Sequence, residues 1–195
     1  MHETRTFADF GLHPDLVAAL ADGGIPPPFP IQSMTLPVAM SRHDIIGQAK
    51  TGTGKTLGFG LPLLHNVVAP SDEGFRFESY ADVLAGVDAI QRDYARHRRA
   101  ARELAVQVSG DLGKAGARRG IRVLTVYGGR AYEPQIEALE RGVEVVVGTP
   151  GRLIDLAGRG HLTLAHARTV VLDEADEMLD LGFLPDVEKL LSLTP

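Results

Sequence analysis

Short apolar runs alternate with longer amphipathic stretches over the second half of the chain. Residues 102–117 place Leu104, Val108 and Leu112 at the spacing of one helix face. The apolar runs after this stretch predict strands at 122–127, 143–147 and 169–172, and the segments between and after them predict helices at 133–141, 152–157 and 184–193. Such alternation predicts an α/β fold with a parallel sheet and helices on both of its faces.

The first part of the chain shows a similar alternation with a proline-rich interruption. A helix is predicted after Pro14, with Leu16 and Leu20 on its apolar face and a glycine pair at its end. The prolines of 26–30 predict a rigid extended arm. Beyond the arm we expect a helix at 31–40, a strand at 44–48 and a helix at 57–68.

Residues 70–101 interrupt the regular pattern. A loop at 69–74 leads into 80–99, which fits a helix with a strongly basic end. The alternative for part of this segment is a short strand at 82–87. The helix is the favoured interpretation.

Length, charge and composition narrow the class of protein. With 195 residues, 44% of them hydrophobic, the chain is long enough for one domain with a core. The absence of cysteine excludes disulfides and thiolate metal sites, and it suits a cytoplasmic protein. No apolar run approaches the ~20 residues of a membrane span, so no membrane segment is expected. The net charge of −5 gives no overall sign of a nucleic-acid partner, so basic residues must act locally.

The stretch 49–56, Ala-Lys-Thr-Gly-Thr-Gly-Lys-Thr, has the pattern of a phosphate-binding loop between a strand and a helix. Its two glycines let backbone N–H groups turn toward phosphate oxygens, and the following helix offers its N-terminus to the same anion. Lys55 is placed to reach the β- and γ-phosphates, and the Thr56 hydroxyl to bind Mg²⁺. Ala49 stands where the pattern usually has glycine, and the alternative is a Gly/Thr-rich turn without a ligand.

Two carboxylates follow the predicted strand at 169–172. In phosphate-loop enzymes an acidic residue at the end of such a strand helps to hold Mg²⁺, and a second carboxylate activates the attacking water. Asp173 fits the metal-binding role and Glu174 the general-base role. The alternative is that both residues only cap the start of a helix.

Together, the loop and the acidic residues resemble the first two motifs of DEAD-box ATP-dependent RNA helicases, the second being Asp-Glu-Ala-Asp at 173–176. Further segments resemble motifs of that family, in the family's order. They are the isolated aromatic Phe7, the Q motif at 24–32, the glycine pair at 128–129, Thr-Pro-Gly-Arg at 149–152 and the stretch 180–183. The resemblance implies a RecA-like phosphate-loop NTPase domain.

The same resemblance implies an enzyme that uses ATP and Mg²⁺. Gln32 would read the adenine edge through its amide, with Phe7 packing near the base. The implied nucleotide-binding residues are Phe7, Ile25, Gln32, Ala49, Lys50, Thr51, Gly52, Thr53, Gly54, Lys55 and Thr56. The implied catalytic residues are Lys55, Asp173 and Glu174, with Mg²⁺ bound by Thr56 and Asp173.

An RNA partner is implied as well. The implied RNA-binding residues are Arg102, Gly129, Thr149, Gly151 and Arg152. They would hold the sugar-phosphate backbone, so binding would be largely independent of RNA sequence. Asp176 would couple the nucleotide state to the RNA side. Family members bind RNA across two RecA-like domains, and closure on ATP pries a short duplex apart locally.

Some features depart from the family pattern. Arg102 begins Arg-Glu-Leu-Ala, as at the end of the family's motif Ia, but two alanines replace the preceding Pro-Thr and the expected apolar strand is missing. We therefore expect one sheet strand to be lost or altered around residues 75–101, through an insertion or a stretch unlike native sequence. In the Q motif, Ile25 and Phe29 replace the usual aromatic and small hydroxyl residues.

The expected organisation is a lead-in and Q-motif region at 1–32 followed by an incomplete RecA-like ATP-binding domain at 33–195. The sequence up to Pro195 contains no S-A-T motif, second RecA-like domain or arginine finger, and such a finger is worth ~10³–10⁵ in rate. This chain alone should bind nucleotide weakly, and hydrolyse ATP and unwind RNA negligibly. The alternatives are a phosphate-loop ATPase of another class and a nucleotide- or RNA-binding module without turnover.

Overall fold

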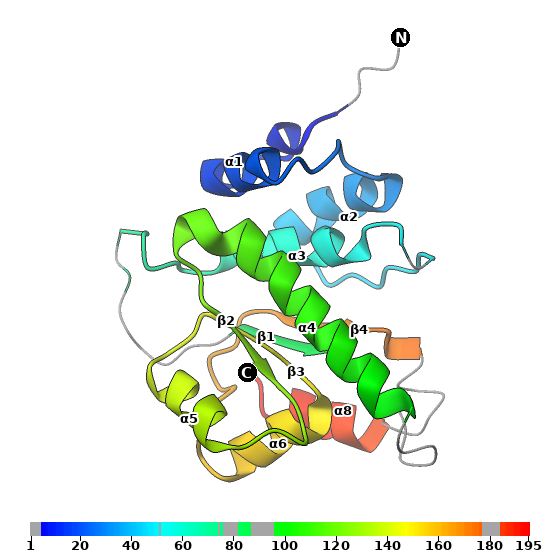
Figure 1. The fold of residues 1–195 in the computed structure, drawn as a ribbon. Helices are drawn as coiled ribbons and strands as arrows, with labels where there is room; N and C mark the ends of the chain where they lie inside the picture. The colour runs from blue at the N-terminus through cyan, green and yellow to red at the C-terminus, as the bar shows by residue number, and fades with distance from the viewer. Residues whose placement is uncertain (1–4, 51, 74, 76–81, 87–95, 177–183) are drawn as a thin grey trace. The chain divides into compact units, whose positions relative to one another are not determined.

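The computed structural model describes residues 5–50, 52–73, 75, 82–86, 96–176 and 184–195 (Figure 1). The chain divides into two compact units. The helical unit comprises Met1–Phe75 and Asp111–Ile121, and the sheet unit comprises Arg76–Gly110 and Arg122–Pro195. Helix α4 (Arg96–Gly116) therefore contributes its first part to the sheet unit and its end to the helical unit.

Most of the helical unit follows the predicted pattern. Its elements are η1 (Phe7–Phe10), α1 (Pro14–Asp22), α2 (Pro30–Met40), α3 (Lys55–Asn66), the end of α4 and η2 (Ala117–Arg119). Pro14 begins α1, where its missing N–H costs no helical hydrogen bond, and Leu16 and Leu20 are buried. The helices predicted around 31–40 and 57–68 are confirmed as α2 and α3.

Small residues of α3 let its neighbours approach closely. A Cβ added to Gly58 would lie 3.2 Å from the Thr35 hydroxyl of α2, and one added to Gly60 would lie 2.4 Å from a Leu112 methyl group of α4. Any side chain at Gly60 would have to displace Leu112, which is fully buried. This packing anchors the helix that follows the phosphate loop.

The strand predicted at 44–48 is wrong. These residues form no strand, and the Ile46 side chain is fully exposed, with Ile45 38% exposed. A strand needs a neighbour for its backbone N–H and C=O groups, and none of the strands described in the structure pairs with this segment. An apolar run alone was therefore insufficient to predict a strand.

Among the residues that the structure describes, the sheet unit contains four parallel strands in the order β2-β3-β1-β4. The strands are β1 (Asp82–Gly86), β2 (Val123–Val126), β3 (Val145–Gly148) and β4 (Val170–Asp173). The helices are the first part of α4, α5 (Glu133–Glu140), α6 (Pro150–Gly158) and α8 (Leu184–Leu191). The predicted α/β class and parallel sheet are confirmed.

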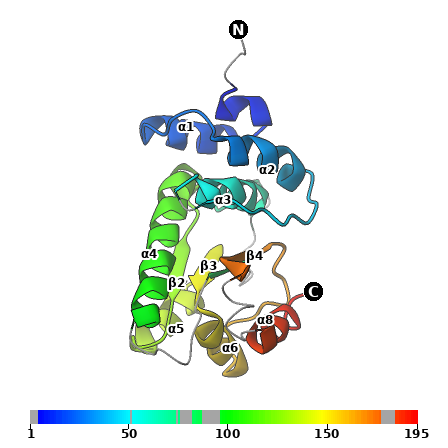
Figure 2. The ribbon, with the colours of Figure 1, turned by 90° about the vertical axis from the view of Figure 1, so that its right-hand side faces the viewer.

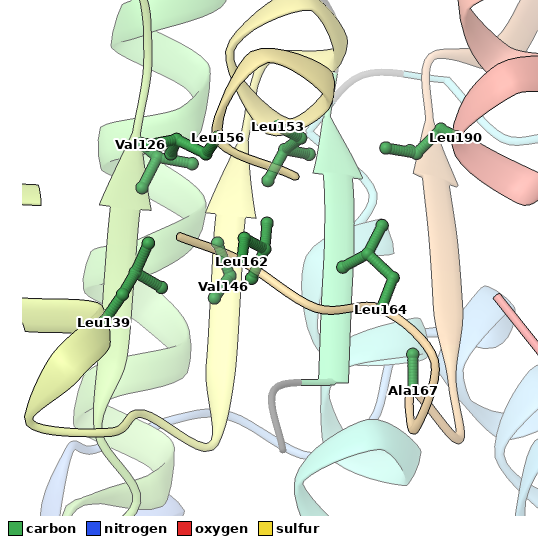
Figure 3. Close-up of a cluster of buried hydrophobic side chains, with 9 residues drawn as sticks. All are labelled: Val126, Leu139, Val146, Leu153, Leu156, Leu162, Leu164, Ala167 and Leu190. Atoms are coloured by element: carbon green, nitrogen blue, oxygen red, sulfur yellow. The ribbon is translucent and has the colours of Figure 1, made fainter. Parts of the chain in front are cut away.

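Helices cover both faces of this sheet. One face carries a buried hydrophobic cluster formed with α6 and α8 (Figure 3). The cluster consists of Val126, Leu139, Val146, Leu153, Leu156, Leu162, Leu164, Ala167 and Leu190. On the other face lies the first part of α4 (Figure 2), where the Thr125 hydroxyl donates a hydrogen bond of 2.7 Å to Ser109 Oγ.

Strand β1 corrects the prediction for 80–99. The favoured helix is wrong at 82–86, where the alternative short strand is confirmed as β1, and α4 is described from Arg96 onward. The expected loss of a strand is also wrong, because β1 is central and pairs with β3 and β4. Pairing on both sides outweighs the local helical pattern. Residues 87–95 lie outside the described part of the chain.

Candidate nucleotide and nucleic-acid sites

The phosphate loop forms a turn directly before α3. Gly52 and Gly54 have φ of 82° and 81°, in the left-handed region that side-chain-bearing residues rarely adopt. Thr53 closes the turn by donating from its hydroxyl to the Lys50 carbonyl oxygen at 2.6 Å. No side chain caps the first turn of α3, so its N–H groups form a typical anion-binding helix start.

Gln32 joins the Q motif to this loop. Its side chain is 2% exposed, its Nε2 donates to the Gly54 carbonyl oxygen at 2.9 Å, and its Oε1 accepts from the Phe29 N–H at 2.9 Å. A Cβ on Gly54 would lie 2.4 Å from that Nε2. The sequence predicted an adenine contact for Gln32, and it missed this second role as a support of the loop.

The other predicted base-contacting residues differ in exposure. Phe7 is buried in η1, whereas Ile25 is 41% exposed. Of the loop residues, Thr51 lies outside the described part of the chain. The contacts of Phe7 and Ile25 with a base stay predictions.

The acidic residues lie at the carboxyl end of β4. Asp173 is the last residue of the strand and is buried, and Glu174 follows with φ of 52°. The Glu174 N–H donates to Asp173 Oδ1 at 3.1 Å. A left-handed residue other than glycine costs ~1–3 kcal/mol, and such strain concentrates at functional sites. Asp176 is exposed.

These acidic residues belong to the sheet unit, and the phosphate loop belongs to the helical unit. The joint binding of Mg²⁺ by Thr56 and Asp173 therefore stays a prediction. Carboxylate and hydroxyl oxygens are ligands that suit Mg²⁺. Among the residues that the structure describes, no cluster of three or more His, Cys, Asp or Glu forms a separate metal site.

Predicted RNA-binding residues meet at the carboxyl ends of β2 and β3. Gly129 has φ of 82°, and a Cβ there would lie 2.3 Å from Arg102 Nη2, so the guanidinium reaches the Gly129 backbone. Thr149 is buried before α6, and its N–H donates to the Val126 carbonyl oxygen at 3.1 Å. Arg102 therefore belongs to this edge although two alanines replace the expected Pro-Thr before it.

Arg152 is a buried cation at the same edge. It is 7% exposed, its guanidinium carbon lies 4.0 Å from the centre of the Tyr132 ring, and its Nη2 donates to the Arg130 carbonyl oxygen at 3.3 Å. Its Nη1 is buried, and no described residue accepts a hydrogen bond from it. Gly151, in the first turn of α6, is exposed.

The Tyr132 ring is itself held in place. Its hydroxyl donates to the Asp155 carboxylate, and Arg159 lies 4.8 Å from the ring centre and donates to the same carboxylate at 2.8 Å. The Tyr132 hydroxyl and then Arg159 lower the pKa of Asp155. Arg152 thus stacks on an aromatic ring with a fixed position.

Sequence reasoning missed three residues of this edge, namely Tyr127, Arg130 and Tyr132. The available signal was the interleaving of aromatic and basic residues between 127 and 132. The stretch 180–183, predicted as a further motif, lies outside the described residues. Within the described part of the chain, no helix has the length and hydropathy needed to cross a membrane.

Comparisons with known proteins identify the family of the chain. The sequence profile of the family described as DEAD/DEAH box helicase matches residues 29–195. The chain is 44% identical over 190 residues to the DEAD-box ATP-dependent RNA helicase CshA of Geobacillus kaustophilus, covering 97% of this chain and 37% of that protein. It is 40% identical over 195 residues to the ATP-dependent RNA helicase RhlB of Shewanella frigidimarina, covering 98% and 42%.

A solved structure is also similar. The crystal structure of a DEAD box protein from the hyperthermophile Methanococcus jannaschii superimposes with a TM-score of 0.80 at 33% identity, covering 97% of this chain and 47% of that one. The chain spans about two fifths of the length of the curated relatives named above. On the profile match and the near-complete coverage of this chain, it belongs to the DEAD/DEAH box helicase family.

Proposed function

We propose that the chain is the ATP-binding domain of a DEAD-box RNA helicase, which couples ATP binding and hydrolysis to RNA binding and local duplex unwinding. The observation that carries the proposal is the contact between Gln32 and Gly54. It joins a residue of the Q motif, which distinguishes this family from other phosphate-loop ATPases, to the turn of the phosphate loop.

The helical unit has groups that fit the phosphates of ATP. At Gly54 a side chain would clash with Gln32, so only glycine fits this turn. Gly54 is also the N-cap of α3 and makes no side-chain capping hydrogen bond. Lys55 would neutralise charge on the β- and γ-phosphates, and backbone N–H groups of the loop would bind their oxygens. Gln32 would orient the adenine while supporting the loop.

The sheet unit would supply the remaining catalytic groups. Mg²⁺, held by Thr56 and Asp173, would supply positive charge that offsets the phosphate oxygens. A carboxylate oxygen of Glu174 would accept the proton of the attacking water. Asp176 would couple these events to RNA.

RNA would bind at the carboxyl edge of β2 and β3. Arg102, Arg152 and the backbone at Gly129 would contact phosphates, with Thr149 and Gly151 beside them. Since such contacts read no base edges, binding would be largely independent of sequence. We also propose a cytoplasmic location, and a second RecA-like domain as the partner across which RNA is held.

The nucleotide part is tested by titrating the chain with a fluorescent ATP analogue and Mg²⁺, with unlabelled ATP and GTP as competitors. We expect ATP to displace the analogue better than GTP, and Lys55→Ala to reduce affinity at least tenfold. Lys114→Ala is the matched control, because Lys114 is an exposed lysine of α4 that is not part of the phosphate loop sequence. Equal binding by the two variants would contradict the proposed site.

Two variants of Gln32 test its roles in base reading and loop support. Gln32→Glu keeps the acceptor for the Phe29 N–H but loses the amide donor, which bonds the Gly54 carbonyl oxygen and which adenine would also need, so we expect weaker nucleotide binding and a smaller preference for ATP over GTP. Gln32→Ala should in addition abolish the preference for ATP. If that preference survives in Gln32→Ala, the chain belongs functionally with phosphate-loop ATPases of another class.

Turnover distinguishes a catalytic domain from a binding module. We expect negligible ATP hydrolysis by the 195-residue chain tested alone, with or without RNA, because the proposed second RecA-like domain would supply the arginine finger. Robust RNA-stimulated hydrolysis by this chain would contradict that expectation. Hydrolysis that stays absent when the chain is joined to a second RecA-like domain would instead favour the binding module.

A further inference from the structure

Arg130 is an exposed cation next to Gly129 in the sequence, and two contacts hold it in place. Its guanidinium carbon lies 5.2 Å from the centre of the Tyr127 ring. Its main-chain carbonyl oxygen accepts the hydrogen bond from Arg152 Nη2. The residue is exposed, whereas Tyr127 and Arg152 are buried, so a rigid support carries an accessible guanidinium.

The same ring carries a second guanidinium. Arg102 lies 5.8 Å from the Tyr127 ring centre, so Arg102 and Arg130 share one aromatic support. With Arg152 they bring three guanidiniums to one edge, and none forms a salt bridge with a carboxylate of the described residues. In a chain with a net charge of −5, this local excess of positive charge favours an anionic ligand.

A buried donor points to the same ligand. Arg152 Nη1 is buried without an acceptor among the described residues, which is costly unless a ligand or water supplies one. The group lies beside the Arg130 carbonyl oxygen, so the unfilled donor and the exposed guanidinium belong to one small region.

We propose that Arg130 is an additional RNA-binding residue. Arg130 and Arg102, both stacked on the Tyr127 ring, together bind one backbone phosphate group of single-stranded RNA. This inference rests on the proposed function and adds a residue that the family motifs did not indicate. The planar guanidinium suits both tasks, because it stacks on an aromatic ring and donates two hydrogen bonds to a phosphate. A repeating phosphate backbone also explains several guanidiniums along one edge better than a single carboxylate does.

The test measures binding of the chain to a fluorescein-labelled oligouridine by fluorescence anisotropy over a series of KCl concentrations. Arg130→Gln should weaken binding about three- to tenfold and reduce the slope of log affinity against log salt by about one, since one phosphate contact is lost. Arg130→Lys keeps the positive charge but not the planar guanidinium that stacks on the ring, so its RNA affinity should lie between those of Arg130→Gln and the unaltered chain.

Arg141→Gln is the matched control, because Arg141 is an exposed arginine that ends α5, away from the carboxyl edge of the strands. Its side chain is outside the proposed contact, and its carbonyl oxygen, which accepts from Arg122, is unchanged by substitution. If Arg130→Gln and Arg141→Gln weaken binding equally, the effect is one of net charge and the inference is overturned.

A second pair of variants examines the aromatic support. Tyr127→Leu removes the ring and should weaken RNA binding more than Tyr127→Phe, which keeps it. Circular dichroism would establish that Tyr127→Leu remains folded. In a double-mutant cycle, Tyr127→Leu should cost less affinity in Arg130→Gln than in the unaltered chain. Fully additive effects would contradict the role of the ring in positioning Arg130.

The outcome for the unaltered chain separates the two proposals. If it binds RNA, and Arg152→Ala weakens binding while Arg130→Gln behaves as its control, the RNA site stands and only the role of Arg130 fails. If the unaltered chain binds ATP but not the oligouridine, the RNA part of the proposed function fails, and the inference fails with it.

Discussion

Residues 44–48 and strand β1 have closely similar sequences but different surroundings. The first reads Asp-Ile-Ile-Gly-Gln and the second Asp-Val-Leu-Ala-Gly. Strand β1 lies between β3 and β4 and pairs with both, whereas 44–48 forms no strand and leaves Ile46 fully exposed. Two parallel neighbours, and not the pattern of apolar residues, distinguish the segment that becomes a strand.

The same difference extends to the two halves of the proposed nucleotide site. The phosphate loop follows 44–48, and its order comes from side-chain contacts such as Gln32 with Gly54. Asp173 ends β4, whose backbone pairs with β1 up to Gly86 opposite Asp173. One half therefore depends on a few hydrogen bonds, and the other half on a sheet.

The largest effect is expected from proline substitution at the third residue of each segment, 44–48 and β1. Leu84→Pro removes an N–H group from a central strand and should destabilise the sheet unit by about 3 kcal/mol or more. Ile46→Pro should change stability by less than about 1 kcal/mol, since Ile46 is exposed and outside any strand. Urea unfolding followed by circular dichroism measures both, and equal losses would mean that 44–48 is a paired strand.

A smaller effect distinguishes the two glycines of the phosphate loop. Alanine at either Gly52 or Gly54 adopts an unfavourable left-handed conformation, at ~1 kcal/mol. At Gly54 the new Cβ also meets Gln32, which should add about 1–3 kcal/mol, whereas no atom lies within 4 Å of a Cβ at Gly52. The same unfolding measurement compares the two variants. Equal losses would show that the loop does not depend on Gln32.

The pH dependence of stability should differ between the two units. In the helical unit, burial and then Arg119 lower the pKa of His65, whose Nδ1 accepts from the His13 N–H at 3.1 Å. Because the folded pKa of His65 is below its ordinary value of 6.5, neutral His65 stabilises the fold above that pH, and this stabilisation is lost as the pH falls through the folded pKa. His65→Asn keeps an acceptor but cannot titrate, so the difference in unfolding midpoint between it and the unaltered chain should vary with pH below 6.5. A difference in midpoint that stays constant with pH would exclude His65 as a source of the pH dependence of stability.

The smallest expected effect lies in the sheet unit, at lower pH. The Tyr132 hydroxyl lowers the pKa of Asp155 below its ordinary value of 3.8, so this contact stabilises the fold above that pH, and the stabilisation is lost as the pH falls through the folded pKa. Tyr132→Phe removes the contact. Its midpoint should lie below that of the unaltered chain at neutral pH and approach it in acid. A difference that persists in acid would point to lost packing instead.

Much of the fold was accessible from local pattern. The presence of α1, α2 and α3 follows from proline positions, glycine stops and apolar spacing, because helical hydrogen bonds join residues close in sequence, although α3 lies two residues before the predicted 57–68. The strands after residue 120 are continuous apolar runs between helices, and their prediction was confirmed. The two errors, at 44–48 and 82–86, both concern short runs whose partners lie far away in the chain.

The candidate site shows the same division. Lys55, Thr56, Asp173 and Glu174 were recognised from motif spacing, since a phosphate loop needs these residue types in this order. The contacts around Arg130 were not recognised from the sequence, because only the folded sheet brings residues from β2, α4 and α6 to one edge.

The sequence by itself therefore determined the α/β class, the presence of most of the helices, the glycines of the phosphate loop and the residue types of its chemistry. The tertiary structure decided which apolar run became a central strand, that Gln32 supports Gly54, and that Arg102 and Arg130 share the Tyr127 ring. The physical reason is the range of the interactions. Helices, turns and glycine conformations depend on neighbours in sequence, whereas strand pairing and stacked side chains depend on residues that meet only in the fold.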